Sequence, residues 1–269
     1  MPELPDVEVF RRYMDSTALH QEIKDVATSE AERILQGTTP EDLKENLVGR
    51  QFTTTRRYGK HLFAGLDGGR WVRTHFGMTG FLEYFKDEEE APGHVRVRYK
   101  FTNGYNLAYD CQRKLGQLEL VKEPETFVDE SGLGPDVLSD ELDFDKFQEL
   151  LGGSRAMIKS ALMNQDLMAG IGNVYSDEIL FKAGVHPKAK AKDLPVDVLQ
   201  ELYSALRDVL QEAIDSEVDP ERMPADFLLP YREEGGECPR CGGNIEKIKV
   251  SGRSSYVCLA CQEKHRKEE

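Results

Sequence analysis

Pro2 and Glu3, next to the start of the chain, are residue types that covalent catalysis by an amine requires. Removal of Met1 ahead of a small second residue would leave Pro2 with a free secondary amine. A chain-terminal amine has a pKa of about 7.7–8.0, against about 10.4 for lysine, so roughly a tenth of it is unprotonated near pH 7. Such an amine can attack a carbon at the aldehyde oxidation level and form an iminium adduct, with Glu3 as general acid. The alternative interpretation is an ordinary helix start.

Four of the five cysteines form two Cys-x-x-Cys pairs that are separated by 16 residues. Two such pairs can place four thiolates tetrahedrally around Zn²⁺. The expected ligands are Cys238, Cys241, Cys258 and Cys261. Disulfides or free thiols are the alternative, but in a chain without a secretory signal this spacing favours one structural zinc ion. A tail this short cannot bury a core, so metal binding would supply its folding energy.

The net charge of −14, from 49 acids and 35 bases, ordinarily argues against a nucleic-acid partner, because phosphates repel it. The charge is segregated, however. Residues 50–80 hold six bases and one acid, whereas residues 119–149 hold 11 acids and two bases. Such segregation can form a basic groove on an acidic body. No apolar run is long enough to cross a bilayer and no signal peptide is visible, so we expect a cytoplasmic protein.

The elements that would position these residues change character along the chain. Short β-branched and aromatic runs, separated by turn signals such as Asn103-Gly104, are typical of an antiparallel sandwich or barrel. Helical periodicity follows them, and Pro5 and Thr39 mark two earlier helix starts. The expected strands are 51–57, 61–66, 71–75, 81–85, 95–101, 105–109 and 117–121, with 245–250 and 255–258 in the tail. The expected later helices are 144–151, 155–163, 175–183 and 196–214, after an acidic solvated linker over 119–149.

Five segments occur in one order along the chain: Pro2–Glu8, Arg56–Lys60, His75–Gly80, Gly170–Tyr175 and the four-cysteine tail. Together they closely resemble the formamidopyrimidine-DNA glycosylase / endonuclease VIII family of base-excision repair enzymes, over nearly the whole chain. The resemblance implies an α+β multidomain fold: an N-terminal antiparallel β-sandwich with flanking helices, a helix–two-turn–helix domain and a C-terminal zinc-finger β-hairpin. We expect these domains at residues 1–130, 131–230 and 231–269. The implied partner is double-stranded DNA with oxidised or abasic nucleotides, bound by a monomer.

By the same resemblance, the enzyme flips a damaged nucleotide out of the duplex. Pro2 attacks C1′ of the deoxyribose, expels the base and forms a Schiff base, while Glu3 protonates the opening sugar ring. β- and δ-elimination then cut the strand on both sides and leave a one-nucleotide gap. Lys60 matches a strand lysine that contacts phosphate and assists elimination. Arg253 matches the finger arginine that grips the phosphates beside the lesion and is linked to δ-elimination.

Further positions match residues that contact DNA in the family. Asn173 lies in the helix–two-turn–helix turn, where Gly170 and Gly172 would let N–H groups approach a phosphate. Met78 would fill the space left by the flipped base, and Arg113 would read the orphaned partner base. The remaining expected contacts are His94, Arg155, Lys159 and the wedge Leu115, and Glu178 matches a glutamate near the active site.

Three features depart from the family pattern. Leu115 stands where the purine-specific branch usually has an aromatic wedge, so stacking would be lost. Asp6 replaces a glutamate that is common in the opening motif. Only ten residues separate Phe227 from Cys238, whereas the purine-specific branch generally has a longer segment with a loop that closes over 8-oxoguanine. We expect excision of 8-oxoguanine and formamidopyrimidine. The alternatives are an endonuclease VIII-type enzyme for oxidised pyrimidines and a non-catalytic damage-binding protein of the same fold.

Overall fold

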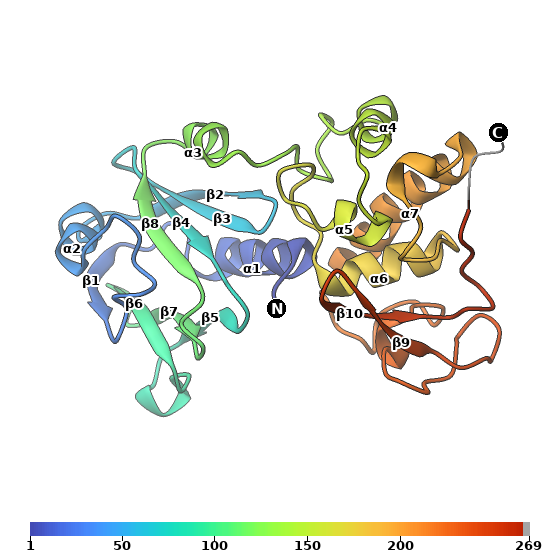
Figure 1. Ribbon diagram of the computed structural model, residues 1–269. Helices are drawn as coiled ribbons and strands as arrows, with labels where there is room; N and C mark the ends of the chain where they lie inside the picture. The colour runs from blue at the N-terminus through green and yellow to red at the C-terminus, as the bar shows by residue number, and fades with distance from the viewer. Residues whose placement is uncertain (266–269) are drawn as a thin grey trace. The chain divides into compact units, whose positions relative to one another are not determined.

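Residues 1–265 are described by the structure, a computed structural model (Figure 1). The chain divides into two compact units between Gly132 and Leu133. The N-terminal unit holds Met1–Pro2 and Asp6–Gly132, and the C-terminal unit holds Glu3–Pro5 and the chain from Leu133 onwards. None of the helices in this described part of the chain combines the length and the apolar character that a bilayer span requires.

The N-terminal unit is a sandwich of two four-stranded antiparallel sheets. One sheet has the strand order β1-β6-β7-β5 and the other has the order β2-β3-β4-β8. Side chains from both sheets, among them Leu62, Tyr99 and Tyr109, form one buried core. The seven predicted strands are confirmed to within two residues, whereas β1 was missed because Lys24 and Asp25 interrupt its apolar alternation. The bounds are β1 Ile23–Thr28, β2 Phe52–Tyr58, β3 His61–Leu66, β4 Trp71–His75, β5 Gly80–Phe85, β6 Val95–Phe101, β7 Asn106–Cys111 and β8 Gln117–Val121.

Helices α1 (Leu4–Thr17) and α2 (Pro40–Leu47) accompany the strands, and a short 3-10 turn, η1 (Glu88–Glu90), joins β5 to β6. The start of α2 shows why it forms where it does. Thr39 Oγ1 accepts a hydrogen bond from Asp42 N–H at 3.1 Å, and the Asp42 carboxylate accepts one from Thr39 N–H at 2.8 Å. This reciprocal capping box satisfies two N–H groups that the helix itself cannot, and it confirms the predicted helix start.

The acidic segment 119–149 is not the free linker that we expected. It begins in β8, forms α3 (Pro124–Ser131) and ends in α4 (Phe144–Gly152). Between these helices, Val137 and Leu142 are fully buried in the core of the C-terminal unit. The acidic side chains are mostly exposed, but the apolar residues between them anchor the segment to packed structure.

The C-terminal unit packs α4 with α5 (Ile158–Leu162), α6 (Asn173–Lys182) and α7 (Val196–Asp215) around its own core. α6 and α7 lie side by side in Figure 1. Two 3-10 turns, η2 (Ala191–Asp193) and η3 (Leu229–Tyr231), complete the helical part. α5 is shorter than the predicted helix 155–163, because Met157 pairs with Lys190 in a β-bridge and holds the preceding residues in an extended loop.

The described chain ends near a two-stranded hairpin of β9 (Glu246–Val250) and β10 (Arg253–Val257), which packs beside α6. The two connecting residues, Ser251 and Gly252, have positive φ angles of 47° and 82°. A two-residue hairpin turn of this kind matches the right-handed twist of its strands. The predicted finger hairpin is confirmed, with β10 starting two residues earlier than expected, so that Arg253 is its first residue.

Candidate functional site

The Glu3 carboxylate is buried, with 1% exposure, at the N-terminal end of α6. Oε2 accepts hydrogen bonds from Gly172 N–H at 2.7 Å and from Tyr175 N–H at 3.2 Å, and Oε1 accepts one from Val174 N–H at 2.8 Å. The first N–H groups of a helix have no partner within the helix, and the helix dipole favours negative charge there. The start of α6 is therefore a cradle for the carboxylate that follows Pro2.

The glycines before α6 do not present free N–H groups to a phosphate, and that prediction is wrong. Gly172 N–H donates to Glu3, and Gly170 N–H donates to Gln165 Oε1 at 3.1 Å. Gly170 O accepts a hydrogen bond from Leu4 N–H at 3.1 Å. A helix start that can bind an anion is thus occupied by the protein's own carboxylate.

Gly172 is required by the closeness of Glu3. A Cβ at this position would lie 2.3 Å from Glu3 Cδ and 2.4 Å from Glu3 Oε1. The φ angle of Gly172 is −123°, which any residue adopts, so glycine is needed here for space and not for backbone freedom. Met1, which precedes Pro2, is 49% exposed.

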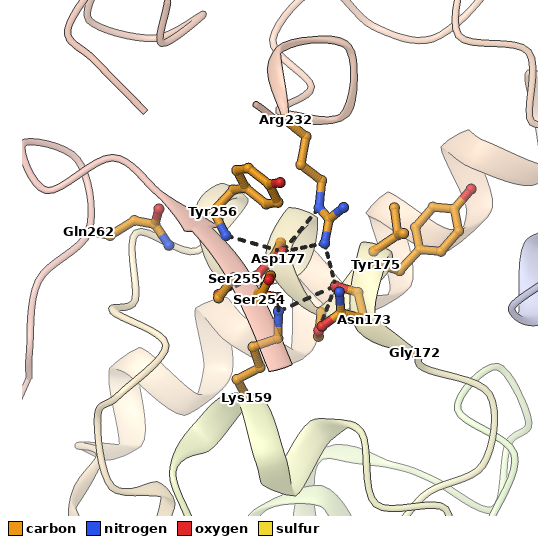
Figure 2. A network of polar contacts seen from close by, with 12 residues as sticks. Lys159, Gly172, Asn173, Tyr175, Asp177, Arg232, Ser254, Ser255, Tyr256 and Gln262 are labelled. Atoms are coloured by element: carbon orange, nitrogen blue, oxygen red, sulfur yellow. Dashed lines mark hydrogen bonds and ion pairs between the residues drawn. The ribbon is translucent and has the colours of Figure 1, made fainter. Parts of the chain in front are cut away.

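Asp177 on α6 is the centre of a buried polar network (Figure 2). Oδ1 accepts hydrogen bonds from Lys159 Nζ at 2.5 Å and from Ser255 Oγ. Oδ2 accepts from Arg232 Nη2 at 2.8 Å, from Arg232 Nε at 3.0 Å and from Tyr256 N–H at 3.3 Å. The Asp177 side chain has no exposed surface. A carboxylate in such a place is stable only when opposite charges and N–H or O–H donors surround it.

Lys159, which we expected to contact DNA, is buried in this network. Its side chain is 1% exposed, and Nζ also donates to Asn173 O at 3.4 Å and to Ser254 O at 3.3 Å. Burial lowers the pKa of Lys159, and the charge of Asp177 opposes that shift. Arg155 is exposed in the loop before α5. The predicted helix over 155–163 therefore does not include Arg155, and Lys159 binds protein groups.

Arg253 is exposed at the tip of the hairpin. Together with Ser160 and Ser251 it lines a cleft of about 440 Å³ between α5 and the hairpin. The two serine Oγ atoms lie 2.8 Å apart and form a hydrogen bond across the cleft. Asn173, the first residue of α6, is half-buried and contributes its carbonyl oxygen to the Asp177 network. An arginine beside a polar cleft is suited to contacts with an anion such as a phosphate.

The four cysteines of the tail bring their Sγ atoms within 4.8 Å of one another. The Sγ atoms of Cys238 and Cys261 lie 3.8 Å apart, and those of Cys241 and Cys258 lie 3.5 Å apart. A tetrahedral site with Zn–S bonds of about 2.3 Å has sulfur atoms roughly 3.8 Å apart. The geometry fits one structural zinc ion, as predicted, and four thiolates leave no coordination position for a substrate.

Met78, Arg113 and Leu115, which were predicted to handle the base pair, lie on two adjoining loops of the N-terminal unit. Met78 is 40% exposed and Leu115 is 52% exposed. Arg113 N–H donates to Thr79 Oγ1 at 3.1 Å. A Cβ at Gly77 would lie 2.5 Å from Leu115 O, so the backbones of the two loops are in direct contact. The structure thus brings together two exposed apolar side chains and an exposed arginine.

His75 holds the turn that carries Met78, a role that no sequence pattern indicates. Its Nδ1 accepts a hydrogen bond from Gly77 N–H at 3.2 Å, and its carbonyl oxygen accepts one from Tyr109 Oη at 3.1 Å. Burial, with Arg73 and Lys60 nearby, lowers the pKa of His75 to about 4. The ring is therefore neutral near pH 7, which is the state in which Nδ1 can accept a hydrogen bond.

Lys60 and His94 also lie outside the strands. Lys60 is in the turn between β2 and β3, after Gly59 with a φ angle of 53°, and not within a strand as the resemblance implied. His94 is exposed directly before β6, and its N–H donates to Asp110 Oδ2 at 2.5 Å. Both residues are therefore placed in loops of the N-terminal unit.

Glu178, expected near the active site, binds backbone groups of the connection between α7 and the hairpin. Its carboxylate accepts hydrogen bonds from Leu228 N–H and Leu229 N–H, both at 2.8 Å. Burial raises the pKa of Glu178 to about 7. Arg232, in the same connection, binds Asp177. Two adjacent carboxylates, directly followed by the apolar run 179–181, were the available sequence signal for this pair of internal contacts.

Comparisons with known proteins agree over nearly the whole chain. Residues 1–118 match the formamidopyrimidine-DNA glycosylase N-terminal domain, and residues 133–222 match the formamidopyrimidine-DNA glycosylase H2TH domain. Residues 235–264 match the zinc finger found in FPG and IleRS. A formamidopyrimidine-DNA glycosylase of Lactobacillus delbrueckii subsp. bulgaricus is 34% identical over 98% of this chain and 100% of its own. That of Bacillus subtilis is 33% identical over the same shares.

The comparison with solved structures finds members of the same family. Formamidopyrimidine-DNA glycosylase of Lactococcus lactis, bound to DNA that contains an AP site, superposes with a TM-score of 0.89 at 29% identity. The match covers 98% of this chain and 100% of that one. The same enzyme in complex with DNA containing Fapy-dG gives a TM-score of 0.87. With the Glu3 cradle, the four-cysteine site and these full-length matches in agreement, the chain belongs to the formamidopyrimidine-DNA glycosylase family.

Proposed function

We propose that this protein excises oxidised bases from double-stranded DNA, with 8-oxoguanine and formamidopyrimidine as its main substrates, and then cuts the strand by β,δ-elimination. The observation that carries the proposal is the carboxylate of Glu3, fixed by three backbone N–H groups directly after Pro2. A protein that only bound damaged DNA would have no chemical use for this pair. The names of the relatives, and the AP-site and Fapy-dG complexes of the Lactococcus lactis enzyme, support the same activity.

The reaction begins, in this proposal, once Met1 has been removed. The nitrogen of Pro2 loses a proton and attacks C1′, the bond from C1′ to the base breaks, and the base leaves. Glu3, next in the chain, is suited to carry a proton to the opening sugar ring. The resulting Schiff base makes the C2′ proton acidic, so elimination breaks the C3′–O bond first and the C5′–O bond second. Lys60 and Arg253 are proposed to contact the phosphates that leave.

The DNA itself is proposed to lie against exposed loops of both units. Met78 fills the space of the flipped nucleotide, Leu115 wedges between bases and Arg113 reads the partner base. His94, Arg155, Asn173 and Arg253 contact phosphates. Lys159 acts on the DNA only through the residues that it binds. The zinc ion, held by the four cysteines, supplies no chemistry to the reaction and stabilises the hairpin that presents Arg253.

Three functional domains follow from this proposal: a catalytic sandwich over residues 1–130, a helix–two-turn–helix domain over 131–230 and a zinc finger over 231–269. The ranges of the three family matches support this division. The enzyme is proposed to act as a monomer on DNA in the cytoplasm.

Replacing Gly172 by alanine is expected to lower base excision by about 10²-fold or more, because the new methyl group displaces the Glu3 carboxylate. The melting temperature should also fall, because displacing the buried carboxylate leaves N–H groups at the start of α6 without their acceptor. Excision from an 8-oxoguanine duplex and thermal unfolding are the measurements. Gly152→Ala, where a Cβ meets nothing within 4 Å, is the matched control. Full activity of Gly172→Ala would contradict the role given to the cradle.

Borohydride trapping tests the proposed function directly. An 8-oxoguanine·cytosine duplex and an abasic duplex are each incubated with the enzyme and borohydride, and the adduct is located by peptide mass spectrometry. We expect an adduct at Pro2 on both duplexes, because reduction converts the Schiff base to a stable amine. The mass also reports whether Met1 is absent. No adduct on either duplex, from protein that lacks Met1, would refute the enzyme and leave the damage-binding protein.

A preference for oxidised pyrimidines is the second candidate, and two observations favour it. Leu115 offers no aromatic face for stacking. The connection from Phe227 to Cys238 is held close to α6 by Glu178 and Arg232, which leaves no long loop there to close over a purine. A thymine glycol duplex in the trapping experiment distinguishes the two. An adduct on thymine glycol and abasic DNA, with none on 8-oxoguanine, would establish the pyrimidine enzyme.

A further inference from the structure

Asp177, on α6, contacts three other segments of the C-terminal unit: α5, the connection that holds Arg232, and β10 (Figure 2). β10 and the start of α6 itself carry residues proposed to bind DNA phosphates. We propose that Asp177 is a positioning residue that holds Asn173 and Arg253 in one fixed arrangement for the phosphates of the damaged strand. The inference rests on the proposed function. Under this inference, Asp177 does not contact DNA itself, but it fixes the positions of two residues that do.

The contacts with the hairpin lie immediately beside Arg253. Asp177 accepts hydrogen bonds from Ser255 Oγ and from Tyr256 N–H, and Lys159, its ion-pair partner, donates to Ser254 O at 3.3 Å. Three consecutive residues after Arg253 are therefore tied to one carboxylate or to the lysine that neutralises it. The strand that begins with Arg253 cannot shift along α6 without breaking several of these bonds together.

The contacts with the start of α6 lie on Asn173. Its carbonyl oxygen accepts hydrogen bonds from Lys159 Nζ at 3.4 Å and from Arg232 Nη2 at 3.3 Å. Both donors are ion-pair partners of Asp177. The two cations thus bind Asp177 and the backbone of Asn173 at the same time. The ion pairs of Asp177 therefore fix both the backbone of Asn173 and the strand that begins with Arg253, although the two residues lie 80 positions apart in sequence.

The buried ion pairs of Asp177 make the positions of Asn173 and Arg253 rigid. Asp177 is fully buried, and the Lys159 side chain is 1% exposed, so water cannot substitute for these partners. Zinc bound by the four cysteines would order the finger itself, and apolar packing of Phe181 and Leu228 against Cys238, Ile245 and Cys258 also holds it. Such packing tolerates small shifts, whereas hydrogen bonds to a charged group have defined distances and angles.

The test compares what Arg253 and Asn173 contribute to binding with and without the network. The probe is a duplex with a tetrahydrofuran abasic analogue, which the enzyme cannot cleave. Arg253→Ala and Asn173→Ala should each weaken binding by about tenfold or more in the original chain. In an Asp177→Asn background, the same two changes should each weaken it by less than about twofold. The slope of log K against log salt should also become shallower by about 0.9 for each phosphate that the protein no longer neutralises.

A purely structural role would not produce that pattern. Val209→Ala, which removes buried volume from α7 away from the network, is the matched control. It should lower the melting temperature and leave the effect of Arg253→Ala unchanged. Equal effects of Arg253→Ala in the Asp177→Asn and original backgrounds would overturn the inference, even if base excision persists. No effect of Arg253→Ala in the original chain would overturn the phosphate contact and the inference with it, while the Pro2 adduct tests the enzyme separately.

Asp177→Asn leaves Lys159 without its counter-charge, so a milder variant is measured beside it. Arg232→Gln removes two hydrogen bonds to Asp177 and one to Asn173 O, from a side chain that is 18% exposed. Its zinc content should remain one ion per chain. The effect of Arg253→Ala should again shrink, to less than half of its original fold-change. A folded, zinc-loaded Arg232→Gln protein that retains the full effect would also overturn the inference.

Discussion

Replacing Glu3 by glutamine is expected to lower base excision by about 10²–10⁴-fold, the usual contribution of a general acid–base group. Cleavage of a preformed abasic site should fall far less, because there the base has already left and the sugar ring can open unaided. The structural reason is that both Glu3 oxygens accept hydrogen bonds from N–H groups. Glutamine keeps one acceptor oxygen and turns an N–H₂ group toward a donor.

The measurement is single-turnover cleavage of an 8-oxoguanine duplex and of an abasic duplex by the same protein preparation. Glu45→Gln, at an exposed position on α2, controls for the loss of one carboxylate charge. Activity of Glu3→Gln equal to that of the original chain on 8-oxoguanine would remove Glu3 from the mechanism. An equal loss on both duplexes would mean that Glu3 mainly positions Pro2.

Replacing Cys258 by serine is expected to lower the zinc content from one ion per chain to nearly none, and to weaken DNA binding by about 10²-fold or more. The binding energy of a structural zinc ion is about 10–16 kcal/mol and stands in for the folding energy of such a finger. Without it, β9 and β10 have too small an apolar core to remain paired. Arg253 would then lose its fixed position, and strand cleavage should fall together with binding.

Metal analysis and binding to the tetrahydrofuran duplex are the measurements. Cys111→Ser, in β7 and outside the finger, is the control, and it should retain one zinc ion per chain. A Cys258→Ser protein that still holds one zinc ion and binds DNA normally would refute the four-thiolate site. Removal of zinc from the original chain by a chelator should reproduce the loss of binding.

The elements that could be predicted from sequence are those with a local cause. Four strands, at residues 61–66, 71–75, 95–101 and 117–121, were predicted with the bounds that the structure has, because β-branched and aromatic runs end at clear turn signals. The capping box at Thr39 is likewise contained in four residues. The zinc ligands follow from spacing alone, since each pair of cysteines forms its own turn.

The contacts that could not be predicted join residues far apart in the chain. The carboxylate of Glu3 meets N–H groups about 170 positions later, and nothing in either segment alone indicates the pairing. Lys159 was expected to contact DNA, and only Asp177 and Arg232 together make its burial acceptable. α5 was predicted too long, because the bridge from Met157 to Lys190 depends on tertiary packing.

The hydrogen bonds of Glu3 and Leu4 decide when the first residues of the chain lose their conformational freedom. Both residues are hydrogen-bonded at the start of α6, so the chain is immobilised from its third residue onwards. One peptide unit, about 3.8 Å between Cα atoms, separates that anchor from Pro2. In the proposed mechanism, the conformational search that a freely moving amine would have to make is completed once, when the protein folds, and is not repeated in each turnover. The end of a polypeptide is ordinarily its least ordered part, whereas in the proposed mechanism it is held as a reagent of high effective molarity.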